Sequence, residues 1–274
     1  MKIQQLKISI VMLLVYMPVF GLQAQEHGYD CLIEPSMSVE VGSSIRGVVD
    51  EVLVKRGDLV ARGDILVRLE SGVQVASVNL ARARSKSTAE VDSRKESMKL
   101  ANQVLVRLTE LYKTSSVSRQ MLDEAESEAF IAESNWRQAQ ENALLARLEL
   151  VQASEILSLR TIKSPISGLV VERMVSPGEL VTEDQAILRL AQVDPLYVEV
   201  IMPAAAFGSV IPNSQAIVTP SGPVEGDYVG KVTIVDSIID AASGTFGVRV
   251  ELPNPEKSLP AGLNCRVEFE SVVG

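Results

Sequence analysis

Hydrophobic and polar positions alternate in two segments of the chain that are copies of one another. The first copy spans residues 47–69 (GVVDEVLVKRGDLVARGDILVRL) and the second spans residues 168–190 (GLVVERMVSPGELVTEDQAILRL), and they align without a gap at an offset of 121 positions. Each copy is typical of short Val- and Leu-rich strands separated by turns. Glycines are expected at these turns: Gly47, Gly57, Gly168 and Gly178. We expect the two copies to pair into one compact β-sandwich.

The segment between the copies has a seven-residue period instead. Residues 73–157 contain no proline or glycine, and good helix-forming residues dominate them. In the second half of this segment, apolar residues fill two heptad positions: Leu122, Ala129, Trp136, Ala143, Leu150 and Leu157 on one, and Ala125, Ala132, Ala139, Ala146 and Ala153 on the other. The first half carries the same period more loosely. The pattern predicts a coiled-coil seam.

Residues 113–118 (KTSSVS) interrupt the heptads with side chains that favour turns and helix caps, and Ser118 is a candidate N-cap. Two helices of about forty residues each would form an antiparallel hairpin about 60 Å long. The alternative, one long helix that dimerises, fits poorly because the two β copies must come back together. We therefore expect the helical hairpin to project from the sandwich as an arm.

The N-terminus has the pattern of a secretory signal. Lys2 and Lys7 precede a mostly apolar stretch at residues 8–22, and Ala24 offers a small residue before a cleavage site. About fifteen apolar residues is short for a membrane span, which needs roughly twenty, although an uncleaved anchor is the alternative. We therefore predict an exported protein.

The net charge of −9, without a basic cluster, disfavours nucleic-acid binding.

The chain has two cysteines, Cys31 and Cys265, which lie near opposite ends of the sequence. In an exported protein such a pair is compatible with one disulfide. Two unpaired, buried thiols are an equally open alternative at this point.

Three residues in the interrupted region provide a more specific signal. Arg107, Leu111 and Ser118 form the pattern Arg, three residues, Leu, six residues, Ser, within RLTELYKTSSVS. This pattern, at the tip of a hairpin that splits a duplicated β-motif, resembles the periplasmic adaptor (membrane fusion protein) family of tripartite efflux pumps, HlyD-like subunits that serve RND-type transporters. The resemblance implies that these three residues contact an outer-membrane channel. The alternative is a solvated Arg, a seam Leu and a plain N-cap.

The resemblance implies an elongated fold of mixed α and β structure. It consists of a split lipoyl-like β-sandwich, interrupted by a long antiparallel α-helical coiled-coil hairpin and followed by a small antiparallel β-barrel. The expected boundaries are a signal peptide at 1–24, an N-terminal segment contributing to the barrel at 25–44, lipoyl half-motifs at 45–70 and 159–191, the hairpin at 71–158 and the barrel at 192–274. Only about a dozen residues follow Gly262, so the membrane-proximal domain of the family is expected to be largely absent.

The sequence carries few signals of catalysis. His27 is the only histidine, which disfavours a Ser-His-Asp site or a His-based zinc site, and neither half-motif carries the lysine of a cofactor carrier. We expect no cofactor, no metal and no enzymatic activity. The resemblance implies a periplasmic scaffold that binds an inner-membrane transporter, an outer-membrane channel and copies of itself, in a ring hexamer. The alternatives are an adaptor of an ABC-type or protein-secretion exporter, and a periplasmic substrate- or metal-binding protein.

Overall fold

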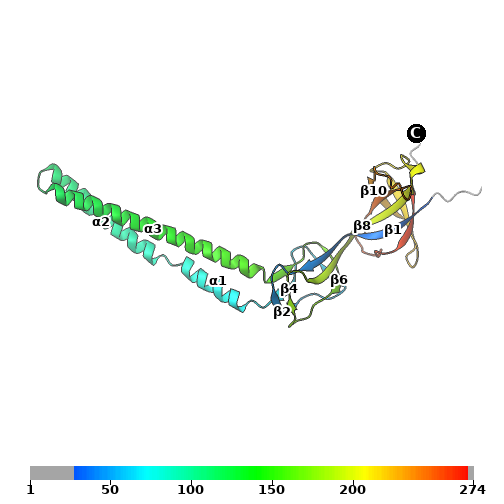
Figure 1. Cartoon of the computed structure of the whole chain (residues 1–274), viewed down its shortest axis with the longest axis horizontal. Helices are drawn as coiled ribbons and strands as arrows, with labels where there is room; N and C mark the ends of the chain where they lie inside the picture. Colours follow the sequence, from blue (N-terminus) through cyan, green and yellow to red (C-terminus); the bar gives the residue numbers. More distant parts are fainter. Residues whose placement is uncertain (1–27, 271–274) are drawn as a thin grey trace, which may run out of the picture.

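The computed structural model describes residues 28–270 and shows an elongated molecule in three parts (Figure 1). A helical arm, a small β-sandwich and a β-barrel follow one another along the long axis. Within residues 28–270, no helix is long and apolar enough to cross a membrane. The predicted signal peptide at 1–24 lies outside the described residues.

The duplication in the sequence is a duplication in the structure. Strands β2, β3 and β4 of the first copy have the same spacing as β6, β7 and the start of β8 in the second, shifted by 121 positions. Their bounds are β2 Gly47–Val52, β3 Leu59–Val60, β4 Ile65–Leu69, β6 Gly168–Arg173, β7 Leu180–Val181 and β8 Ala186–Pro203. The copies exchange strands, because β2 pairs with β7 and β3 pairs with β6. The predicted pairing of the halves is therefore confirmed.

The four glycines of the repeat fall into two classes. Gly57 and Gly178 lie in turns with φ of +92° and +85°, a backbone region that other residues rarely adopt. Gly47 and Gly168 were expected in turns as well, which is wrong, since each is the first residue of a strand. Their need for glycine is steric: a Cβ at Gly47 would meet the Arg160 side chain, and a Cβ at Gly168 would overlap a backbone carbonyl.

Two long strands connect the sandwich to the barrel. Strand β1 (Tyr29–Gly42) pairs with β8 along most of its length, from Cys31 opposite Val200 in the barrel to residues 37–42 opposite 186–192 in the sandwich. The N-terminal segment thus contributes to the barrel, as expected, and also to the sandwich. The expected boundary between residues 191 and 192 falls inside β8, because one continuous strand serves both units.

The barrel is closed by β1. Its strand order is β1-β12-β9-β10-β11-β8, with an additional β1–β8 pairing, and the remaining strands are β9 Gln215–Pro220, β10 Tyr228–Val235, β11 Thr245–Leu252 and β12 Asn264–Phe269. A short 3₁₀ turn, Ala204–Ala206, follows β8. Alternate residues of β11, such as Val248 and Val250, are buried, as the period-two pattern of a half-buried strand requires. Separate hydrophobic cores therefore fill the barrel and the sandwich.

The arm contains three helices instead of the two expected. The outgoing side is divided into α1 (Gly72–Ser85) and α2 (Ala89–Lys113), and the returning side is one helix, α3 (Arg119–Ser158). The break at residues 86–88 lies in a run of Ser, Lys and Thr, and Ser and Thr favour caps over helix interiors. Both α1 and α2 pack against α3, so the arm remains one hairpin.

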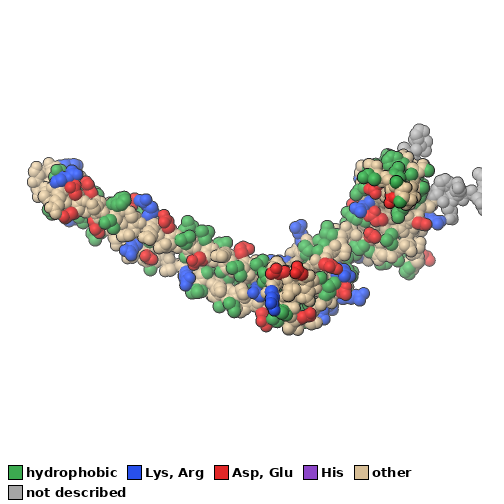
Figure 2. Space-filling model, viewed as in Figure 1, with side chains coloured by type: hydrophobic (Ala, Val, Ile, Leu, Met, Phe, Trp, Pro, Cys, Tyr) green, Lys and Arg blue, Asp and Glu red, His purple; other side chains and the backbone are tan. Residues whose placement is uncertain are grey.

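The predicted heptad seam is the buried stripe of α3. The fully buried residues of this helix all lie at the two predicted heptad positions: Leu122, Ala125, Ala129, Ala132 and Ala139. Helix α2 has no fully buried residue, consistent with its looser period. Figure 2 shows hydrophobic side chains at the surface along the arm. Phe130 and Leu145 of α3 are exposed at 70% and 57%.

Candidate functional site

The turn at the tip of the arm is built by the last residues of α2. The Ser116 amide donates to the Leu111 carbonyl (3.0 Å) and the Ser115 amide donates to the Tyr112 carbonyl (2.9 Å). These are the two hydrogen bonds of a Schellman motif, in which one residue adopts the left-handed conformation. Ser115 is that residue, with a φ of 59°. The Thr114 hydroxyl also donates to the Leu111 carbonyl (2.9 Å), so the end of α2 is well capped.

The returning helix begins at a hydroxyl cap. The Ser118 backbone is extended, and its Oγ accepts a hydrogen bond from the Met121 amide at 3.2 Å. The predicted N-cap role of Ser118 is confirmed. The cap satisfies one of the free amides that every helix N-terminus exposes. Together with the Schellman motif, it fixes the turn between α2 and α3 through the backbone.

A cation at the start of α3 is held by neighbours on both helices. Arg119 forms an ion pair with Asp123 (2.8 Å), and its guanidinium carbon lies 6.0 Å from the centre of the Tyr112 ring. The Asp123 carboxylate, followed by the Tyr112 side chain, raises the pKa of Arg119 above its ordinary value. Sequence reasoning missed this contact, although Arg119 and Asp123 at i and i+4 were a visible signal.

The three residues predicted to contact a channel lie at this tip. Arg107 and Leu111 are four residues apart on α2 and therefore lie on neighbouring turns of one face, while Ser118 lies across the turn. Leu111 is 39% exposed, and Arg107 and Ser118 are exposed as well. Arg107 helps line a surface hollow of about 410 Å³ with residues 102, 103 and 106 of the same helix.

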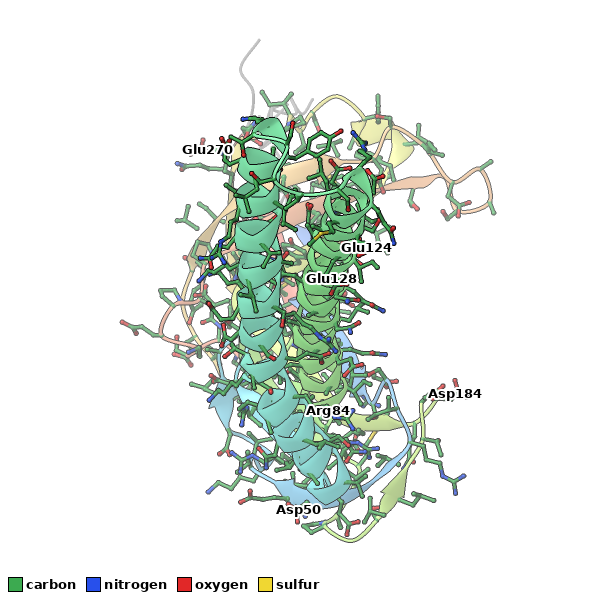
Figure 3. The ribbon with its side chains drawn as sticks, turned by 90° about the vertical axis from the view of Figure 1, so that its left-hand side faces the viewer. Asp50, Arg84, Glu124, Glu128, Asp184 and Glu270 are labelled. Carbon is green, nitrogen blue, oxygen red and sulfur yellow. A yellow bond between two sulfur atoms is a disulfide. The ribbon has the colours of Figure 1, made fainter. Side chains whose placement is uncertain are left out.

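The cationic side chains near the tip differ in whether they form an ion pair. Lys113 pairs with Glu110 and Arg119 pairs with Asp123, whereas Arg107 makes no ion pair within the described part of the chain. A solvated guanidinium keeps its five donors available for carbonyl or carboxylate groups of another molecule. The opposite side of the tip is acidic, since Glu124 and Glu128 lie along α3 (Figure 3).

Family comparisons cover nearly all of the described chain. Residues 37–192, more than half of the sequence, match the CzcB-like barrel-sandwich hybrid domain, and residues 195–272 match the CusB-like β-barrel domain. The chain belongs to the membrane fusion (adaptor) proteins of efflux pumps. The first match spans the sandwich with its inserted arm, and the second spans the barrel of this adaptor protein.

Individual relatives agree with this assignment. The adaptor protein is 27% identical over 242 residues to the multidrug resistance protein MdtE of Escherichia coli (strain K12), a match that covers 81% of this chain and 59% of MdtE. It is 25% identical over 239 residues to the toluene efflux pump periplasmic linker protein TtgG of Pseudomonas putida, covering 82% of this chain and 54% of TtgG. The chain thus spans less than two thirds of the length of these curated relatives.

The fold is also shared with a solved structure. The crystal structure of MacA from Actinobacillus actinomycetemcomitans superposes with a TM-score of 0.76 at 25% identity, covering 89% of this chain and 78% of that one. The adaptor protein carries exposed polar groups at the end of a long arm, where another surface can reach them.

Proposed function

We propose that this adaptor protein is a non-catalytic periplasmic scaffold that links an inner-membrane efflux transporter, of the RND type, to an outer-membrane channel. Arg107, Leu111 and Ser118 would contact the periplasmic end of the channel. The sandwich and the barrel would associate with copies of themselves into a ring, a hexamer, that encloses a path for drugs or metabolites. The names of MdtE and TtgG, a multidrug resistance protein and a toluene efflux pump linker, support an efflux role.

One observation carries the assignment of the tip. Arg107 is exposed in the last two turns of α2, near the tip of the arm, and has no ion-pair partner in the part of the chain that the structure describes. By contrast, Arg137 in the middle of the arm pairs with Glu133 one turn away. An unpaired guanidinium keeps its donors for a partner.

A periplasmic location accounts for a second feature. Cys31 and Cys265 form a disulfide, and such bonds persist in oxidising compartments such as the bacterial periplasm. The contact of one tip with a channel would be small. Repetition around a ring would raise the overall affinity without any new kind of contact, because each further contact becomes intramolecular.

The tip assignment is tested by reversing the charge of Arg107. In a strain that depends on this protein for efflux, Arg107→Asp is expected to lower export and to weaken crosslinking of the tip to the channel. The matched control is Arg137→Asp, the same change on an exposed residue in the middle of the arm, and it is expected to retain export. Equal expression and equal circular dichroism of both variants exclude misfolding. Full export by Arg107→Asp would refute the assignment.

A further inference from the structure

A groove lies at the junction of the sandwich and the barrel. Figure 1 shows β1 and β8 passing from one unit to the other at this junction. Its volume is about 620 Å³, within the range of about 300–1,000 Å³ that is typical of small-molecule sites. One wall comes from the sandwich, with Leu59, Leu169 and Val171. Val193 on β8 and Pro260 and Ala261 from the β11–β12 loop are among the residues that form the other side.

The loop that forms the outer wall is held firmly by one buried side chain. Asn254 is 4% exposed, and its Nδ2 donates to the carbonyls of Val193 and Leu259, both at 2.9 Å. Its Oδ1 accepts from the Leu259 amide at 3.2 Å, and its own amide donates to Asp194 Oδ1 at 2.9 Å. These bonds clamp the loop onto β8, so the groove does not depend on a ligand to form it.

The lining of the groove is apolar apart from one cation. Lys257 is the single charged residue among those that line it, in a chain that has more acidic than basic residues. It makes no ion pair within residues 28–270; its backbone has a φ of 53°, and its amide donates to the Asn254 carbonyl at 2.9 Å. Asp194 and Lys257 both line an adjoining hollow, where Asp194 Oδ1 accepts the hydrogen bond from the Asn254 amide and forms no ion pair with Lys257.

A concave apolar surface with one unpaired charge is what a small amphiphilic ligand requires. Apolar patches that remain in contact with water mark binding sites more often than scattered apolar residues do. The lining gives affinity through burial of apolar area, and the ammonium group favours an anion. We propose that this groove binds a small organic anion with an apolar or aromatic body. We take this ligand to be a transported compound, and that part of the inference rests on the proposed function.

The proposal is tested with two dyes that share an aromatic body. The purified full chain is titrated with 8-anilinonaphthalene-1-sulfonate, which carries a sulfonate, and with N-phenyl-1-naphthylamine, which is neutral. We expect one anionic dye per chain, bound more tightly than the neutral dye. Lys257→Gln should weaken the anionic dye about tenfold, the loss expected for one charge-assisted contact, and should leave the neutral dye little changed.

A second variant tests the groove itself. Val171→Glu places a carboxylate on the half-buried sandwich wall and should abolish binding of both dyes. The matched control is Val229→Glu, the same change at a 60% exposed site on β10, which does not line the groove, and it should bind both dyes as the parent does. Equal effects of the two Val variants, or no saturable binding by the parent chain, would overturn the proposal.

Light scattering on the same samples tests whether a second copy of the chain, instead of a small ligand, occupies the groove. If Val171→Glu lowers the molar mass while Val229→Glu does not, a second copy of the chain fills the groove, and the ligand proposal is wrong. The scaffold function is tested separately by export with Arg107→Asp. Absent dye binding in a chain that still supports export would remove this inference and leave the proposed function intact.

Discussion

Cys31 on β1 lies directly opposite Cys265 on β12, and their sulfur atoms form a disulfide. The two Cα atoms are 4.9 Å apart, and both residues are buried, at 7% and 3% exposure. The bond joins the first and the last strand of the barrel across 234 positions of sequence. The sequence alone left a disulfide and two free thiols open, because only the antiparallel register brings these strands together.

Removal of this disulfide should destabilise the barrel. A loop of this size has an entropic ceiling of about 5 kcal/mol, and losses of about 2–5 kcal/mol are typical of native disulfides. We expect the double variant Cys31→Ala and Cys265→Ala to lower the urea midpoint of barrel unfolding. Dithiothreitol should lower the midpoint of the parent chain and leave the double variant unchanged. A parent chain insensitive to reduction would contradict a stabilising role.

Gly168 should be intolerant of any side chain. It lies opposite Val60 in the β3–β6 pair, and a Cβ added there would overlap the Ala191 carbonyl on β8. Backbone must shift to admit it, so Gly168→Ala should cost about 1–3 kcal/mol of folding free energy. Gly72→Ala is the control, because open space surrounds that position at the start of α1. Equal urea midpoints for the two variants would show that the sandwich adjusts freely.

Replacement of Ser115 by glycine should stabilise the turn at the tip of the arm. It is exposed, and its φ of 59° is unfavourable for a residue with a Cβ. Ser115→Gly relieves this strain, and we expect the hairpin tip to gain about 1 kcal/mol or less. Hydrogen exchange of the amides in residues 111–122 would measure the gain as slower opening. Ser116→Gly, next to it but without a positive φ, should give no protection. Faster exchange in Ser115→Gly would contradict the strain argument.

Local patterns predicted the elements that depend on local physics. The two β copies, the seam of α3 and the Ser118 cap all follow from periodicity or capping within a few residues. The break at residues 86–88 was missed for two reasons. Helix propensity predicts helix ends only weakly. In addition, α1 and α2 both pack on α3, so the heptad pattern gives no sign of the break between them. The steric role of Gly168 was missed because its neighbour Ala191 is distant in sequence.

The sequence predicted part of the candidate site as well: it identified the residues at the tip but not their surroundings. The residue pattern at the tip pointed to Arg107, Leu111 and Ser118. That Arg107 forms no ion pair within residues 28–270 depends on where the neighbouring carboxylates point, which the sequence does not reveal. The groove could not be predicted at all. It arises because β1 and β8 run through both units and bring a loop at 253–263 against the sandwich strands β3 and β6, a pairing that no local pattern encodes.

The small residues of the seam should set how closely the helices approach. Ala139 is 4% exposed and faces the outgoing side of the arm, so Ala139→Leu must either strain its rotamer or separate the helices. We expect a cost of about 1–3 kcal/mol, read as faster hydrogen exchange along α3 and the helices packed on it. Gln138→Leu is the adjacent control on the exposed face, where helix propensity is nearly equal and no packing changes. If both variants exchange alike, the alanine stripe does not limit the approach of the helices, and the seam would tolerate larger side chains without loss of the arm.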